Sequence, residues 1–202
     1  MTTWDDHDYG ENDGGAYYPF KKTAEQMYLD AWDVPAADER RRRDGVYTSD
    51  IIGPPGQRVQ IIMLDTRFFR TELQATDERN APGKERYVPM EGAFGTMLGE
   101  AQWDWLAGEL KKPAELRLLV SSIQVHADGH GWEAWRTMPA ERQKLYDMID
   151  ASGAEGVVLL SGDRHSGSIY RRDDVVDYPL YEVTASSLNL PSSVWRAERG
   201  DT

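Results

Sequence analysis

The feature that most constrains the fold is an alternation of apolar runs and helical patterns that begins near residue 59. The runs 59–66, 116–125 and 156–160 are rich in Val, Ile and Leu, as is typical of strands buried in a covered sheet. Between them, the segments 98–110 and 139–151 carry apolar residues at helical spacing. Strands that alternate with helices predict an α/β fold in which helices cover the sheet.

Further strands are expected on either side of this alternation. Residues 46–52 read as a strand that the turn 53–56, Gly-Pro-Pro-Gly, joins to the strand beginning at Val59. Residues 168–170 and 178–185 are predicted to form the last strands.

The helices expected near the beginning of the chain follow from local signals. Thr23 and the Gln three residues later resemble a capping box, which predicts a helix over 23–32. Pro35 is expected to start a second helix that runs to Arg43. We interpret the four arginines at 40–43 as a solvated helix end rather than an anion site. The long irregular segment 71–96 indicates a functional or mobile loop.

Composition limits the partners. The chain has 202 residues, enough for a single domain over 1–202 with a substantial core. Its 35 acidic and 23 basic residues give a net charge of −12, which on average repels nucleic acid and anionic membranes. No cysteine is present, so disulfides and thiolate ligands are excluded. No apolar stretch is long enough to span a bilayer, and we expect neither a membrane segment nor a nucleic-acid partner.

The first chemically informative motif is Asp-Asp-His-Asp at residues 5–8. Three carboxylates and an imidazole in four consecutive positions suit neither a core nor an ordinary surface. They are the donors that hard and borderline cations prefer. The motif therefore predicts one part of a cation site.

A second motif places Asp163 and His165 just after the apolar strand that ends at Leu160. Catalytic groups of α/β folds commonly follow the carboxyl ends of strands. The one-residue spacing allows both side chains to leave the backbone on the same side. Taken alone, Asp-x-His also fits a hydrogen-bonded turn, but together with the first motif it favours metal binding.

Other polar residues also follow predicted strands, but their position alone does not show their role. Asp65 and Arg67 come after the strand that begins at Val59, where Arg67 is a candidate phosphate contact. The alternative, an Asp65 that caps a turn and an Arg67 paired with an acid, is favoured over it. His126 and His130 are candidate ligands, but exposed or loop-bracing histidines fit the pattern at least as well.

Five segments occur in an order that resembles one known family, the alkaline phosphatase D (PhoD-like) branch of the calcineurin-like metallophosphoesterases. They are residues 4–10, 64–67, 98–106, 121–125 and 161–165. The resemblance covers nearly the whole chain and implies a layered α/β/β/α sandwich with metals at the strand ends. The implied reaction is hydrolysis of phosphate mono- or diesters with small-molecule substrates.

The resemblance also implies roles for individual residues. Asp6, Asp163 and His165 correspond to metal ligands, and His7 to the catalytic group that meets the leaving oxygen. Arg67 and Arg164 are candidate substrate contacts, and Gln124 stands near a position where relatives present a ligating histidine. The implied cofactors are divalent or mixed-valence ions, with Ca, Fe, Mn and Zn left open.

Earlier motifs of the family, including a strand whose carboxylate bridges the metals, are expected before the opening motif. We therefore expect this chain to match the C-terminal part of such an enzyme, without its N-terminal strands. Activity of this part is expected to be weak or absent, and association through an exposed sheet edge is expected. A non-catalytic, cation-binding module is the alternative function, and a metal-dependent nuclease is disfavoured by the acidic surface. Family analogy suggests a periplasmic or secreted parent protein.

Overall fold

A mixed sheet of six strands forms the centre of the protein, in the order β1-β2-β3-β4-β6-β5. The computed structural model describes residues 1–92 and 94–187. Its strands are Thr48–Ile52 (β1), Val59–Met63 (β2), Leu116–Val120 (β3), Val157–Ser161 (β4), Gly167–Arg172 (β5) and Leu180–Ala185 (β6). The neighbours β2, β3, β4 and β6 run parallel, whereas the edge strands β1 and β5 pair antiparallel. The expected α/β fold is confirmed.

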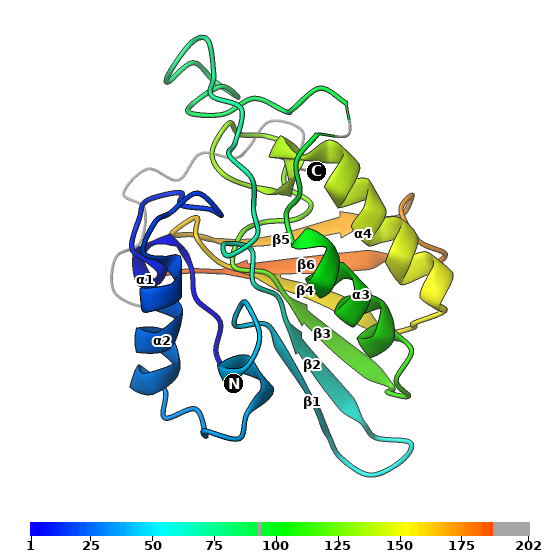
Figure 1. Ribbon diagram of the computed structural model, residues 1–202. Helices are drawn as coiled ribbons and strands as arrows, with labels where there is room; N and C mark the ends of the chain where they lie inside the picture. Colours follow the sequence, from blue (N-terminus) through cyan, green and yellow to red (C-terminus); the bar gives the residue numbers. More distant parts are fainter. Residues whose placement is uncertain (93, 188–202) are drawn as a thin grey trace.

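Two long helices cover one face of this sheet (Figure 1). Gly99–Leu110 (α3) connects β2 to β3, and Pro139–Ser152 (α4) connects β3 to β4. Side chains such as Leu106 of α3 and Ile149 of α4 share one buried core with Ile62, Leu119 and Leu159 of the sheet. Both helices therefore form where the apolar periodicity predicted them.

A smaller core lies beside the carboxyl ends of the strands. The short helix Asp6–Tyr9 (α1) and the helix Lys21–Ala31 (α2) pack there, with Trp4, Leu29 and Phe68 among the buried residues. The region predicted as a helix from Pro35 to Arg43 forms only a 3-10 turn, Glu39–Arg41, so that prediction was wrong. Its arginines pair within the chain, Arg40 with Asp38 and Arg41 with Asp30, which differs from the expected solvated helix end.

Within residues 1–92 and 94–187, the opposite face of the sheet has no helix on it. One row across this face contains Met63, Val120, Leu160, Val183 and Ile169, as the strand register shows. These side chains are half-buried or exposed, and Ile169 is 75% exposed. The described residues contribute a single sheet, so the second β layer implied by the resemblance does not come from them.

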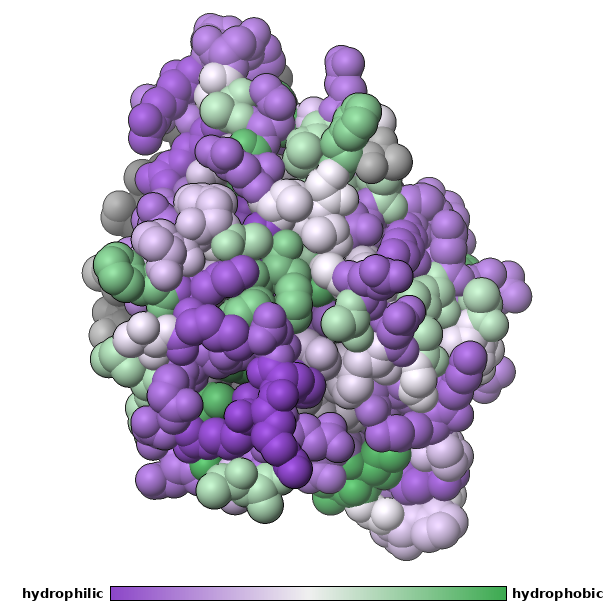
Figure 2. Space-filling model, viewed as in Figure 1, coloured by the Kyte–Doolittle hydropathy of each residue, from purple (hydrophilic) through white to green (hydrophobic). Residues whose placement is uncertain are grey.

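The outer surface of the helix side is largely polar. Figure 2, which shows the molecule from the same direction as Figure 1, is dominated by hydrophilic residues with small apolar patches between them. Within the described residues, no helix has both the length and the apolar character needed to cross a membrane.

Candidate metal centre

A carboxylate just beyond β2 organises the opening segment of the chain. Asp65, two residues beyond β2, is fully buried and accepts hydrogen bonds from Trp4 Nε1 at 2.8 Å and from the backbone N–H of Val46 at 2.9 Å. It also accepts the backbone N–H groups of Arg67 and Phe68, both at 2.9 Å. The structure thus gives Asp65 the turn-capping role that was favoured for it, and Asp65 fixes Trp4 directly before the acidic motif.

Helix α1 carries that motif to the carboxyl end of the parallel strands. Asp5 precedes the helix, and its backbone N–H donates to the Asp8 carboxylate at 3.3 Å. Asp6 is buried and accepts the backbone N–H of His7 at 2.7 Å and that of Asp13 at 3.3 Å. The start of the helix therefore holds both the buried Asp6 carboxylate and the exposed Asp8 carboxylate in place.

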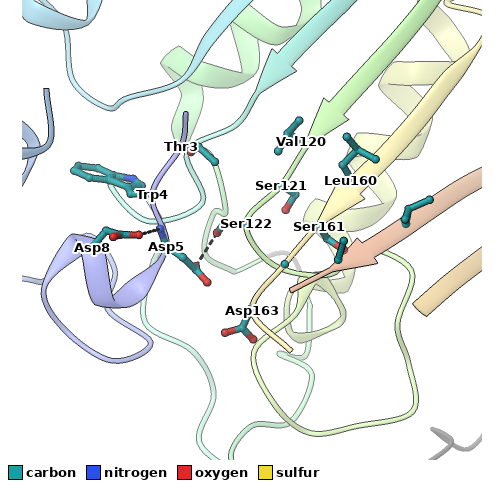
Figure 3. A pocket seen from close by; sticks show the side chains of 13 residues that line it. Thr3, Trp4, Asp5, Asp8, Val120, Ser121, Ser122, Leu160, Ser161 and Asp163 are labelled. Carbon is teal, nitrogen blue, oxygen red and sulfur yellow. Dashed lines mark hydrogen bonds between the residues drawn. The ribbon is translucent and has the colours of Figure 1, made fainter. Parts of the chain in front are cut away.

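Asp163 reaches the same place from β4. It follows the strand end Ser161, with its backbone in the left-handed region at a φ of 65°. A non-glycine residue seldom adopts that conformation, and such strain is commonly found at functional sites. One ligand atom each of Asp5, Asp6 and Asp163 lies within 4.8 Å of the other two. Figure 3 shows the Asp5 and Asp163 carboxylates near each other beside the strand ends.

Negative charge is concentrated at this cluster. Burial and the negative charges of Asp5 and Glu133 raise the pKa of Asp163 to about 8. The cluster lies at one side of a cavity of about 400 Å³, whose wall includes Ser121, Ser122 and Leu160. Closely spaced carboxylates of this kind repel one another unless a proton or a cation offsets their charge.

The structure therefore brings together two of the three predicted ligands and adds one. Asp6 and Asp163 meet, and Asp5, which was predicted only as part of the acidic motif and not as an individual ligand, joins them. The available signal was its place in the same run of acidic residues. His165 is exposed and, within the described part of the chain, is not one of the three clustered groups. Its role as a ligand stays a prediction.

The other predicted site residues lie at varying distances from the cluster. His7 is 84% exposed on its side chain, with Nε2 4.0 Å from the Asp6 carboxylate. Arg164 directly follows Asp163, and its guanidinium lies 5.6 Å from the centre of the Trp132 ring. Arg67 is fully buried, paired with Asp5 and with Glu133. The acid-paired alternative for Arg67 is the arrangement observed, and a phosphate contact by Arg67 stays a prediction.

Gln124 and His130 share one buried hydrogen-bond network, and His126 is buried with partners of its own. Gln124 Nε2 donates to Tyr170 and Thr184, both at 2.9 Å, while its Oε1 meets His130 Nε2 at 2.9 Å. His126 contacts the Tyr146 hydroxyl at 2.9 Å. Burial lowers the pKa of His126 to about 4 and that of His130 to about 3. The loop-bracing interpretation of both histidines is confirmed.

Comparison with known proteins identifies the family of the chain. Residues 1–197 match the family described as PhoD-like phosphatase. The chain belongs to the PhoD-like phosphatase family. It is 28% identical over 120 residues to alkaline phosphatase D of Bacillus subtilis (strain 168), an alignment that spans 55% of this chain and 20% of that protein.

A solved structure of PhoD shares the fold, with a TM-score of 0.66 and 20% sequence identity. The match covers 92% of this chain and 39% of the solved chain. The chain thus spans well under half the length of these PhoD-like relatives.

Proposed function

We propose that this chain supplies one wall of a metal-dependent phosphoesterase site that hydrolyses phosphate mono- or diesters. The observation that carries the proposal is the convergence of Asp5, Asp6 and Asp163 at the carboxyl end of the parallel strands. Membership of a phosphatase family supports phosphoester chemistry at this place. Two segments more than 150 residues apart in the sequence meet there, which an ordinary acidic surface does not require.

The donor set fits a hard cation. Asp5, Asp6 and Asp163 offer only carboxylate oxygens, which suit Ca²⁺ or Mn²⁺. Zn²⁺ or an iron ion would favour a histidine as well, for which His7 and His165 are the candidates from the sequence. The chemistry that such an ion supplies when bound is polarisation of a phosphoryl oxygen and activation of water.

The remaining side chains act on the substrate itself. His7 lies in solvent beside Asp6, and we assign to its imidazole the protonation of the oxygen of the departing alcohol. Arg164 carries a positive charge next to Asp163, where it offsets the charge of the phosphate oxygens. In this proposal the chain contributes cation binding, leaving-group protonation and charge stabilisation.

The test uses the chain freed of metal with a chelator and then given Mn²⁺ or Ca²⁺, with p-nitrophenyl phosphate and its bis ester as substrates. We expect weak metal-dependent turnover, which D6N and D163N reduce by at least the roughly 10- to 100-fold seen when metal-site support is lost. The exposed carboxylate Asp177 provides the control, and D177N should keep wild-type turnover.

The same experiment separates the alternative, a cation-binding module without catalysis. That alternative is favoured by the share of PhoD that this chain spans. It predicts Mn²⁺ binding that D163N abolishes, together with no turnover of either ester at any metal concentration. Turnover that is equal with and without metal would contradict both functions.

A further inference from the structure

Arg67 joins the acidic cluster to the protein interior. Its side chain is fully buried, and its Nε donates to Asp5 Oδ1 at 2.9 Å. On the other side, its Nη1 lies 2.7 Å and 2.6 Å from the two carboxylate oxygens of Glu133. The guanidinium therefore lies between a carboxylate of the cluster and a carboxylate of the core.

A second donor reaches the same oxygen of Asp5. Ser122, just beyond β3, donates from its hydroxyl to Asp5 Oδ1 at 2.8 Å, and Figure 3 shows this contact at the cavity. The Ser122 hydroxyl is itself 2.6 Å from that of Thr66. Donors from the ends of two neighbouring strands thus converge on one oxygen, which fixes the rotation of the Asp5 carboxylate.

Glu133 is a costly group to bury, and its partners show what it does. Its side chain is 1% exposed, and it pairs with Arg67 and with Arg70, whose Nη2 lies 2.7 Å away. Buried ion pairs seldom add net stability compared with apolar side chains, so a positioning role explains their presence better. Arg70 uses the same Glu133 but donates to the carbonyls of Asp13 and Gly14 rather than to Asp5.

We propose that Arg67 is a positioning residue that, with Ser122 and with Glu133 behind it, holds Asp5 in the orientation in which it binds a cation. Arg67 thereby acts through Asp5 and not by contacting phosphate. This inference rests on the proposed cation site and assigns to that site a supporting layer of groups. Ligands held by such groups bind metal more tightly because less ordering remains when the ion arrives.

The test measures Mn²⁺ binding to the chain by calorimetry and records the electron paramagnetic resonance spectrum of the bound ion. R67K keeps the charge but loses the planar fork, and R70K makes the same change at the other side of Glu133. We expect R67K to weaken Mn²⁺ binding by about 10-fold or more and to alter the spectrum. We expect R70K to bind within about twofold of wild type, even where both variants lose similar stability in urea.

A milder pair of variants covers the case in which R67K fails to fold. S122A removes one donor to Asp5, whereas S121A removes a neighbouring hydroxyl that bonds to Trp135 and to the carbonyl of Ile123. We expect S122A, and not S121A, to weaken Mn²⁺ binding. If the wild-type chain binds Mn²⁺ and both R67K and S122A bind it with the same affinity, the positioning role is overturned while the cation site remains supported. Absence of Mn²⁺ binding by the wild-type chain would overturn both.

Discussion

Asp65 shows how a single carboxylate joins the two parts of the molecule. It belongs to the end of β2, yet its oxygens accept the indole of Trp4 and the backbone of Val46 as well as two donors of its own turn. The Trp4 indole anchors the segment that carries the acidic motif. Replacement of the Asp65 carboxylate should therefore lower the stability of the fold and also disturb the cation site.

We predict that D65N destabilises the fold by about 2–3 kcal/mol, because the amide turns one accepting oxygen into a donor facing N–H groups. Urea unfolding followed by tryptophan fluorescence measures the change. D50N, at an exposed position of β1, is the control and should shift the midpoint little. A D65N midpoint equal to that of D50N would show that the carboxylate charge is not needed there.

His126 predicts how stability depends on pH. Burial lowers its pKa from 6.5 to about 4, with the positive charges of Arg172 and Arg142 acting in the same direction. The unfolded chain therefore binds a proton between these values while the folded chain does not. The contribution of His126 to stability should fall as the pH drops from about 6.5 towards 4, with a slope of up to about 1.4 kcal/mol per pH unit.

Urea unfolding at several pH values tests this expectation. H126Q should remove this contribution in that window, whereas H7Q, which removes an exposed imidazole, should keep the wild-type profile. A pH profile that H126Q leaves unchanged would contradict the assignment.

At the residue scale, the sequence predicted the location of the candidate metal site better than it predicted which residues form it. Asp6 and Asp163 meet because each follows an element that ends at the same edge of the sheet. Asp5 was not assigned because a one-turn helix places adjacent side chains in directions that spacing alone does not resolve. Asp163 and His165 both have a left-handed backbone, with φ values of 65° and 52°. One-residue spacing places two side chains on the same side only where the backbone is extended, so that expectation does not apply to this turn.

At the scale of the elements, the apolar pattern of the sequence predicted which residues are buried better than it predicted their secondary structure. The strand expected to reach Val125 stops at Val120, although Ile123 and Val125 are buried. Beyond Val120 the backbone leaves the ladder, and the N–H groups of Val125 and His126 instead reach the buried carboxylate of Glu182. The side chain of Glu182, on the distant strand β6, thus binds the backbone beyond the end of β3. The local sequence pattern around Val120 does not show this contact.

Gly108 inside α3 and Gly153 at the end of α4 make a matched test of helix boundaries. Gly153 ends α4 with a φ of 65°, and a Cβ added there would meet no atom within 4 Å. Gly108 lies inside α3, also with open space around it. G153A should therefore cost about 1 kcal/mol because of its backbone conformation alone. G108A should stabilise by about 0.5–1 kcal/mol because alanine favours the helix interior.

Thermal or urea unfolding of the two variants measures both effects, and the opposite signs are the point of the comparison. Equal shifts in the same direction would mean that helix boundaries do not decide the response at these positions.

At the scale of the whole molecule, the sheet is covered on one side only by the described residues. Helices α3 and α4 bury one face, while the other presents a row of apolar side chains that ends at Ile169 on the edge strand β5. The sequence predicted the covered sheet from its apolar strands. It could not show which face this chain covers, because strands buried on both faces look alike in the sequence.

That open face predicts self-association of the chain. Apolar sheet faces and unpaired edge strands join other copies unless something covers or charges them. We expect a sedimentation coefficient that rises with protein concentration, and I169K should suppress the rise by placing a charge on the edge of the open face. F94K is the matched control, because Phe94 is also 75% exposed but lies in the loop between β2 and α3. Suppression by F94K to the same extent would show that exposed apolar area in general, rather than this sheet face, drives the association.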